Sequence, residues 1–303
     1  MFVTPYMYKN LLNWAFLLSL TVLMAQTGFA QGTEPGRIVV ARVVGAVTLT
    51  NKADNSTRAA VNNEQIAAGY MVTTAPEASV VLVFSNGSTV NLRGDSQLDI
   101  ETFLQDPFAE DFRITEATAE PSTSTTRLNL SRGELIGNVK TLNSAGGSSF
   151  VIQTPVGAAG IRGTTFRIVF RPDGAGSAFF ALTTVEGNVV LTQGGVETPV
   201  AAVNSQAQEI SINVEVSVDA ATGAVTVTLP EGQTFTIQAA AATTTAAVVE
   251  AVQQNIQAIA TAAFTPAGNT NAGSDTSTSN PTPTEAPPTA QPMPPRTTTG
   301  DGV

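Results

Sequence analysis

Short runs in which apolar and polar residues alternate follow one another through most of the chain. β-branched residues dominate these runs, as in residues 38–44 and 47–50, and also the wholly apolar run at residues 80–84; glycine, asparagine or proline separates one run from the next. Many such runs at near-regular spacing indicate an all-β domain, because alternation with period two puts successive side chains on opposite faces of a strand. We predict that this domain occupies residues 37–238. The periodicity alone is compatible with a sandwich, a barrel or a β-solenoid.

The hairpin with the clearest turn signal joins residues 80–84 to residues 89–92. Its connection contains Asn86 and Gly87. This pair favours a two-residue type I′ turn, in which both residues have positive φ. A slip of one residue would turn the buried side chains of both strands outward, so we expect Asn86 and Gly87 to fix the register.

The pattern changes near the C-terminus. Residues 239–264 are rich in alanine and carry valine and isoleucine at spacings of three and four, which predicts one amphipathic helix. We interpret it as a helix that covers the β domain, with a partner-binding or self-associating helix as the alternative. Residues 265–303 are dominated by proline, threonine and serine, and we expect this tail to be disordered.

Residues 1–30 have the features of a secretory signal peptide. Lys9 precedes an apolar run over residues 11–25, and small residues stand at Gly28 and Ala30. The run of about 15 residues is shorter than the ~20 that a membrane-spanning helix needs. We therefore expect cleavage after Ala30 rather than an uncleaved anchor. The mature protein is then periplasmic or extracellular and does not span a membrane.

Composition excludes several classes of function. The net charge is −10 with only 14 lysines and arginines, so we predict no nucleic-acid partner, which would require a basic surface. Histidine and cysteine are both absent. The chain can therefore form no disulfide, zinc–thiolate site or imidazole base, and we predict no cofactor.

An acidic segment covers residues 95–120 and contains a third of the acidic residues of the chain. Its candidate interaction residues are Asp95, Asp99, Glu101 and Asp106. We interpret them as a solvated acidic face. Two alternatives remain: a Ca²⁺ site, although the alternating acids with a central glycine are missing, and a pair of carboxyl groups acting as acid and base.

One further catalytic arrangement is formally available, a serine activated by lysine. It would use Lys140 with Ser131 or Ser144. No oxyanion-hole motif surrounds either serine, so we expect no enzymatic activity from this arrangement.

The middle of the β domain contains the least ordinary stretch, residues 150–168. Thr154-Pro155 ends one alternating run, because proline cannot donate to a ladder. Arg162 is the only charged residue between Phe150 and Phe166, and we expect its guanidinium to bond the neighbouring loops and hold this turn. Gly163 suits a position where a Cβ would clash, so Gly163→Val should lower the melting temperature.

The same stretch resembles the periplasmic domain of the FecR family. The similarity is carried by Phe150, Thr154, Pro155, Arg162, Gly163, Thr164, Phe166 and Ile168. Upstream landmarks also fit: Gly69 with Thr73-Thr74, the hairpin over residues 80–92, and Gly133 with Glu134-Leu135. The resemblance covers residues 43–191, with residues 69–170 as its best-matching core. It implies an elongated stack of short strands, β-solenoid-like or sandwich-like.

The resemblance also implies a function. FecR-family domains relay the state of an outer-membrane receptor, so we expect a non-enzymatic module that contacts an envelope protein, either a receptor or a membrane regulator. Full-length family members also have a cytoplasmic anti-sigma region and a membrane helix. We expect neither here, which puts direct sigma-factor control in doubt. Edge strands and loops would supply the contact surface.

Two other functions remain as alternatives. A carbohydrate-binding or cell-wall-binding module would need exposed aromatic rings, for which Phe103, Phe108 and Phe112 are the candidates. A structural surface protein would use the threonine- and proline-rich tail as a spacer.

Overall fold

The computed structural model describes residues 33–109, 113–218, 225–228 and 237–262. The predicted signal peptide and the predicted disordered tail lie outside these residues. The strands are β1 (Glu34–Pro35), β2 (Ile38–Val44), β3 (Val47–Asn51), β4 (Thr57–Ala59), β5 (Glu64–Ile66), β6 (Tyr70–Thr74), β7 (Ser79–Phe84), β8 (Thr89–Leu92), β9 (Ser96–Gln105), β10 (Ser124–Asn138), β11 (Ser149–Thr154), β12 (Gly157–Pro172), β13 (Ser177–Gln193), β14 (Val196–Ala201), β15 (Gln208–Val218), β16 (Val225–Thr228) and β17 (Gln238–Ala239). The helical elements are the 3-10 turn η2 (Ser144–Gly146) and the α-helix α2 (Ala242–Thr261).

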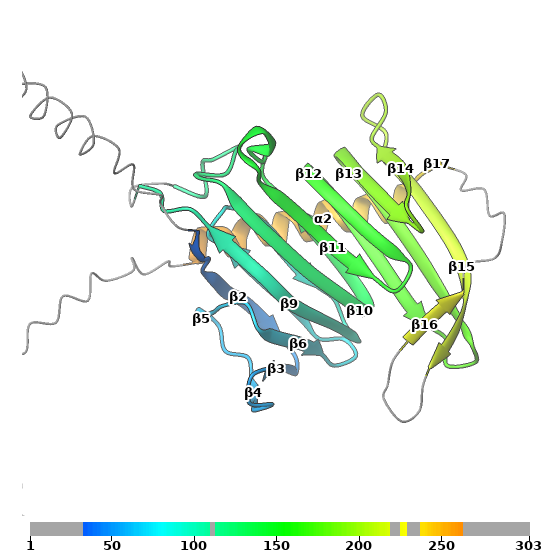
Figure 1. Cartoon of the computed structure of the whole chain (residues 1–303), viewed down its shortest axis with the longest axis horizontal. Coiled ribbons are helices and arrows are strands. Elements are labelled where there is room, and N and C mark those ends of the chain that lie inside the picture. Colours follow the sequence, from blue (N-terminus) through cyan, green and yellow to red (C-terminus); the bar gives the residue numbers. More distant parts are fainter. Residues whose placement is uncertain (1–32, 110–112, 219–224, 229–236, 263–303) are drawn as a thin grey trace, which may run out of the picture. The chain divides into compact units, whose positions relative to one another are not determined.

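The strands form one continuous sheet that folds over into two layers and does not close into a barrel (Figure 1). The front layer has the order β4-β3-β6-β9-β10-β11-β12-β13-β14. The back layer has the order β5-β2-β7-β8-β10-β12-β13-β15, with β16 and β17 beside β15. The predicted all-β fold with one C-terminal helix is confirmed.

Three strands, β10, β12 and β13, belong to both layers. The first half of β10 pairs with β9 and β11, and its second half pairs with β8 and β12. β12 and β13 change neighbours in the same way along their lengths. The runs on either side of Gly133, and those on either side of Gly187, are therefore halves of continuous strands that cross between the layers, rather than separate strands.

Each of these long strands crosses at a glycine in the left-handed region. The φ angle is +100° at Gly133, +63° at Gly163 and +82° at Gly187. A Cβ on Gly133 would lie 2.0 Å from the Oγ of Ser96 and 2.4 Å from its Cα. The Cα cannot move without moving the backbone of β9. A residue with a side chain would add about 1–2 kcal/mol of backbone strain to this clash.

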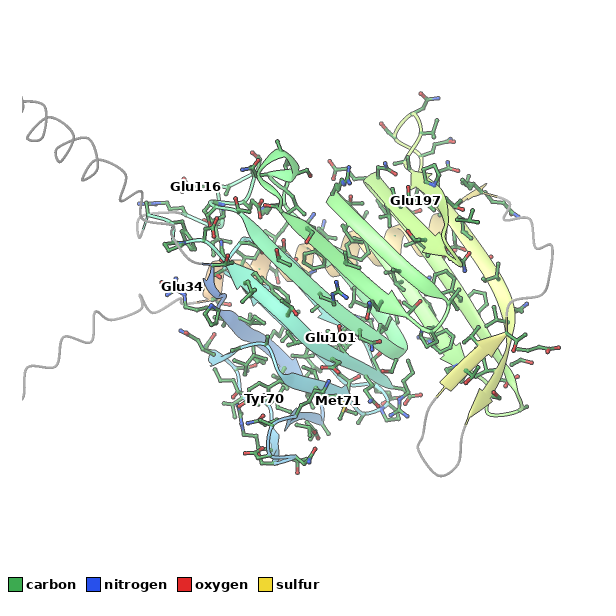
Figure 2. The ribbon with its side chains drawn as sticks, viewed as in Figure 1. Glu34, Tyr70, Met71, Glu101, Glu116 and Glu197 are labelled. Atoms are coloured by element: carbon green, nitrogen blue, oxygen red, sulfur yellow. The ribbon has the colours of Figure 1, made fainter. Side chains whose placement is uncertain are left out.

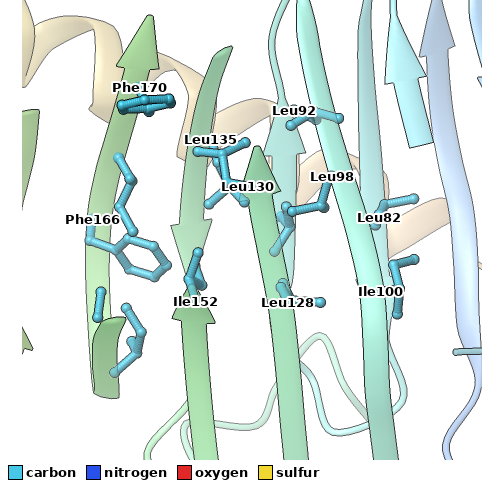
Figure 3. Packing of buried hydrophobic residues seen from close by; sticks show 14 of the residues in the cluster. Leu82, Leu92, Leu98, Ile100, Leu128, Leu130, Leu135, Ile152, Phe166 and Phe170 are labelled. Carbon is cyan, nitrogen blue, oxygen red and sulfur yellow. The ribbon is translucent and has the colours of Figure 1, made fainter. Parts of the chain in front are cut away.

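The hydrophobic core lies between the two layers. The rings of Phe84 and Phe103 pack edge to face with 5.1 Å between their centroids, and the Phe150 ring lies 6.1 Å from that of Phe84. All three rings are almost fully buried, each contributing about 1.5–3 kcal/mol through removal from water. Figure 3 shows the interleaved side chains of the two layers, among them Leu82, Leu92, Leu98, Ile100, Leu128, Leu130, Ile152 and Phe166.

The helix α2 lies against the outer face of the back layer, behind the sheet in Figure 1. Its buried side chains, at three- and four-residue spacing, are Val248, Ala251, Asn255, Ala258 and Ile259. Nothing in the described residues covers the outer face of the front layer in the same way. No helix in the described ranges has the length and hydrophobicity needed to cross a membrane.

The prediction of a type I′ turn at Asn86-Gly87 is wrong. Gly87 has a φ of +87°, but Asn86 does not have positive φ. The N–H of Gly87 donates to the carbonyl of Phe84 at 2.8 Å, and the N–H of Phe84 donates to the carbonyl of Ser88. This is a type I turn followed by a left-handed glycine. The Asn86 amide is buried and donates to Ser124 Oγ at 3.0 Å, which holds Asn86 out of the left-handed region.

Two glycines of β12 that are three residues apart should respond in opposite ways to alanine. At Gly163 the left-handed backbone and the Thr141 Cα, 3.1 Å from a built Cβ, both oppose a side chain. At Gly160 φ is outside that region and a Cβ would meet only the Val190 carbonyl at 3.7 Å. Urea unfolding should show a loss of about 1–3 kcal/mol for Gly163→Ala and a gain of up to ~1 kcal/mol for Gly160→Ala. Equal effects would contradict the corner geometry.

Candidate functional site

A cleft of about 910 Å³ opens beside the point where β10 crosses between the layers. We name it the turn cleft. It brings together five residues that the sequence singled out: Asp95, Ser131, Gly133, Thr154 and Pro155. The other lining residues are Gln97, Asn129, Arg132, Gln153, Gly157, Ala158, Arg171, Pro172 and Gly174.

The Thr154-Pro155 turn forms one wall of the turn cleft. It links β11 to β12, in which Thr154 and Gly157 face each other. The hydroxyl of Thr154 donates to the carbonyl of Gly157 at 2.9 Å and accepts from the N–H groups of Val156 and Gly157 at 3.3 and 3.2 Å. Threonine thus closes the turn with its side chain, while Pro155 needs no hydrogen-bond partner for its nitrogen. The turn is fixed by local bonds rather than by Arg162.

Carboxamide side chains form the floor of the cleft. Asn129 and Gln153 face each other across the parallel pair β10–β11, and Gln97 lies on β9 opposite Arg132. All three carboxamides are half-buried on the outer face of the front layer. Gln97 Nε2 lies 3.0 Å from the sulfur of Met71, which is labelled with Glu101 on this face in Figure 2. Each amide presents both donors and acceptors, so this floor suits a ligand with both kinds of group.

Two arginines, Arg132 and Arg171, line the turn cleft, and Arg171 also belongs to an ion-pair cluster that extends beyond the cleft. Glu134 accepts from Arg167 Nε at 2.8 Å and from the Arg171 guanidinium at 2.7 Å. The Glu134 and Arg167 side chains are only 14% and 19% exposed, whereas Arg171 is 55% exposed. Arg132 is exposed at the corner of β10 and makes no hydrogen bond or ion pair with the residues that the structure describes. The cleft therefore offers two accessible guanidinium groups within a chain of strongly negative charge.

Residues 70–190, which contain the turn cleft, match the family model described as FecR protein. The chain carries a FecR-like domain. Two crystal structures of a proposed anti-sigma factor from Parabacteroides distasonis ATCC 8503 align with 52% of this chain at 13% identity, with TM-scores of 0.32 and 0.33. The alignment covers 58% of that protein, so the chain spans little more than half of its length. Among curated proteins, none matches the chain.

The later residues of the FecR-like motif, Thr164 and Phe166, lie just past the corner of β12 at Gly163, away from the Thr154-Pro155 turn. Thr164 is buried, its hydroxyl donates to the Asn188 carbonyl at 2.9 Å, and its backbone exchanges two 3.0 Å hydrogen bonds with Val139. Phe166 is fully buried against Gly137, where a Cβ would lie 2.3 Å from the ring. These residues pack around the corner of β12 at Gly163 and do not line the turn cleft.

The expected role of Arg162 is wrong. Its side chain is exposed and, among the described residues, forms no hydrogen bond or ion pair. The reason is its place on the outer face of the front layer, opposite Asn188, where solvent rather than a loop surrounds the guanidinium. An exposed guanidinium at this position is available to a partner.

The four candidate acids are not brought together. Asp95 lines the cleft, Asp99 pairs with Lys52, and Glu101 accepts from Asn129 Nδ2 at 3.5 Å. Asp106 is joined through its backbone to Thr123 and Ser122 beyond the far end of β9. Within the described ranges no cluster of three or more acids could hold a metal ion. Period-two alternation on β9 explains the outward direction of Asp99 and Glu101.

The hypothetical serine–lysine pairs are not assembled around the cleft. Ser131 lines the turn cleft, while Lys140 follows the opposite end of β10 and lies against Gly87. Ser144 is exposed in η2. Partial burial lowers the pKa of the Lys140 amino group below its usual value of 10.5.

Sequence reasoning missed Gln97, Asn129, Gln153, Arg132 and Arg171. Alternation could have shown that Gln153 points outward with Val151. It could not have shown that Asn129 lies beside it, because β10 and β11 pair in parallel although fewer than 30 residues separate them. Parallel neighbours need a crossover, and no local turn signal marks one here.

Glu134 pairs with Arg167 and Arg171, and losing Glu134 should destabilise the fold more than losing the exposed Arg171. Removing Arg171 leaves an exposed position and should cost about 0–1 kcal/mol. Glu134→Ala leaves Arg167 mostly buried without its carboxylate and should cost about 1–3 kcal/mol. Urea unfolding of the variants Arg171→Ala and Glu134→Ala at low and high salt measures this. Equal losses in both variants would contradict the view that the ion pair between Glu134 and the mostly buried Arg167 contributes most of the stability.

Lys140 should make stability depend on pH in the alkaline range. Because its pKa is lower in the folded than in the unfolded state, charging it opposes folding. This penalty is complete below the folded pKa and disappears as pH rises through that value towards 10.5. Lys140→Met should therefore be more stable than the parent at pH 7, and the difference should shrink near pH 10. Urea unfolding at both pH values tests this, with the exposed Lys52→Met as control; a difference that grows with pH would contradict it.

Proposed function

We propose that this chain is an exported, non-enzymatic docking module whose turn cleft binds an extended segment of an envelope protein. The observation that carries the proposal is the position of the cleft. It is built within the FecR-like segment, around the Thr154-Pro155 turn, on the layer that α2 leaves uncovered.

The chemistry of the cleft suits a polypeptide. The carboxamides of Gln97, Asn129 and Gln153 can donate to carbonyls and accept from N–H groups, which a peptide backbone presents alternately. Arg132 and Arg171 in the lining suit an acidic side chain or a terminal carboxylate of the partner. An acidic partner segment would also be disfavoured elsewhere on this negatively charged chain, which favours one orientation.

The proposal places the mature protein, residues 31–303, in the periplasm or outside the cell. The signal-peptide pattern of residues 1–30 supports export. An envelope receptor or a membrane regulator is the partner that the FecR-like domain favours. In this view the chain reports the state of that partner by binding, without a reaction of its own.

The test uses photocrosslinking in the native envelope, with the crosslinking residue placed at Gln153 in the cleft. The control position is Thr192, which points outward on the same layer but does not line the cleft. We expect one defined protein adduct at Gln153, lost when Asn129→Ala and Arg132→Ala are combined, and no such adduct at Thr192. The same adducts at both positions would contradict docking in the cleft. Recovery of glycan without a defined protein would instead support the wall-binding alternative.

A further inference from the structure

The contact between α2 and the back layer is apolar at its two ends. Near the C-terminal end, Ala258 and Ile259 pack on β2 and β7; near the other end, Val248 and Ala251 pack on Ile136 of β10. The sheet residues under the C-terminal end are Val39, Ala41, Val81 and Val83. Both clusters are small and consist mainly of alanine and valine.

The middle of this contact is polar. Asn255 lies on the buried face of α2 between Ala251 and Ala258, and α2 crosses β8 there. The side chains of β8 on the helix side are Thr89 and Asn91, because they stand opposite Val83 and Val81. Asn255 and Asn91 are 1% exposed, and Thr89 is fully buried.

None of these polar groups is satisfied. The Nδ2 and Oδ1 atoms of Asn91 and of Asn255, and the Oγ1 of Thr89, have no hydrogen-bond partner in the described structure. Withdrawing a donor or an acceptor from water without replacing its hydrogen bond opposes burial. The docked helix therefore carries a penalty at its centre that its small apolar ends must offset.

The termini of the helix carry no stabilising side-chain cap or charge. Ala241 precedes α2 and offers no side-chain cap, and no acidic residue stands in the first turn or basic residue in the last. The core, in contrast, is continuous between the layers and does not include any residue of α2. The sheet can therefore stay folded when α2 leaves it.

From this asymmetry we propose that α2 is a releasable cover. It leaves the back layer as a unit, without unfolding of the sheet, and exposes the apolar face formed by Val39, Val81, Val83 and Ile136. The free energy of release depends on three polar side chains, those of Asn91, Thr89 and Asn255. Water can form hydrogen bonds with them only after α2 has left the sheet. This inference rests on the helix contact alone and is independent of the turn cleft.

Thiol labelling of the full mature chain tests the proposal, because the chain has no cysteine of its own. Val83→Cys places a thiol under α2, while Leu82→Cys places one in the core between the layers, on the adjacent residue of the same strand. We expect an exposed-thiol reagent to modify Cys at position 83 at least about tenfold faster than at position 82. Equal rates would show that α2 leaves only when the whole domain unfolds and would overturn the proposal.

The second measurement asks whether the polar centre controls release. Asn255→Leu removes two unsatisfied atoms and adds apolar contact, so labelling at position 83 should become about tenfold slower or more. The matched control is Gln257→Leu, which changes an exposed residue of the same helix and should leave the rate unchanged. Faster labelling in Asn255→Leu would mean that Asn255 satisfies Asn91 in solution, and it would overturn the assigned role of the polar centre.

Discussion

The backbone conformation at the corners is the constraint on which the rest of this fold depends. β10, β12 and β13 serve both layers only because Gly133, Gly163 and Gly187 take positive φ where each strand crosses. At Gly133 the backbone of β9 passes so close that no Cβ fits. Without these crossings, the second half of each strand could not pair in the back layer, and the core between the layers would lose one of its walls.

The sequence predicted the strands better than their connections. Runs of β-branched and other apolar residues at 38–44 and 80–84 identified β2 and β7, which pack against the core on one face and against α2 on the other. Glycine separates strands at several points of the chain, but Gly133 and Gly187 lie inside the long strands β10 and β13. The pattern cannot distinguish the two cases, because a left-handed glycine ends a hairpin strand and also permits a corner. At Asn86 a tertiary bond to Ser124 overrode the local turn preference.

The candidate site could be predicted only in part, for a related reason. Thr154 and Pro155 predict a turn from the local sequence, because the Thr154 hydroxyl bonds only to Val156 and Gly157 and the Pro155 ring restricts its own backbone. The carboxamides of Asn129 and Gln153 form part of one site only because the parallel pairing of β10 and β11 places them side by side. Arg162 appeared to need a partner because it is the only charged residue between Phe150 and Phe166, but its side chain points away from the core, where water solvates it. The charges of neighbouring residues along the chain do not predict whether a side chain is exposed, because in a strand this depends on the face to which the side chain points.

The same long strands connect the two surfaces for which we propose roles. β10 contributes Asn129 and Ser131 to the turn cleft and, past the corner at Gly133, Ile136 to the face under α2. β10 is thus one continuous strand that both surfaces share, and it offers a route by which binding in the cleft could be coupled to release of α2. Any such coupling must be reciprocal: a ligand in the cleft that favours the covered state would itself bind more weakly when α2 is released. The crossing strands that build the fold would then also be the elements through which binding on one face is sensed on the other.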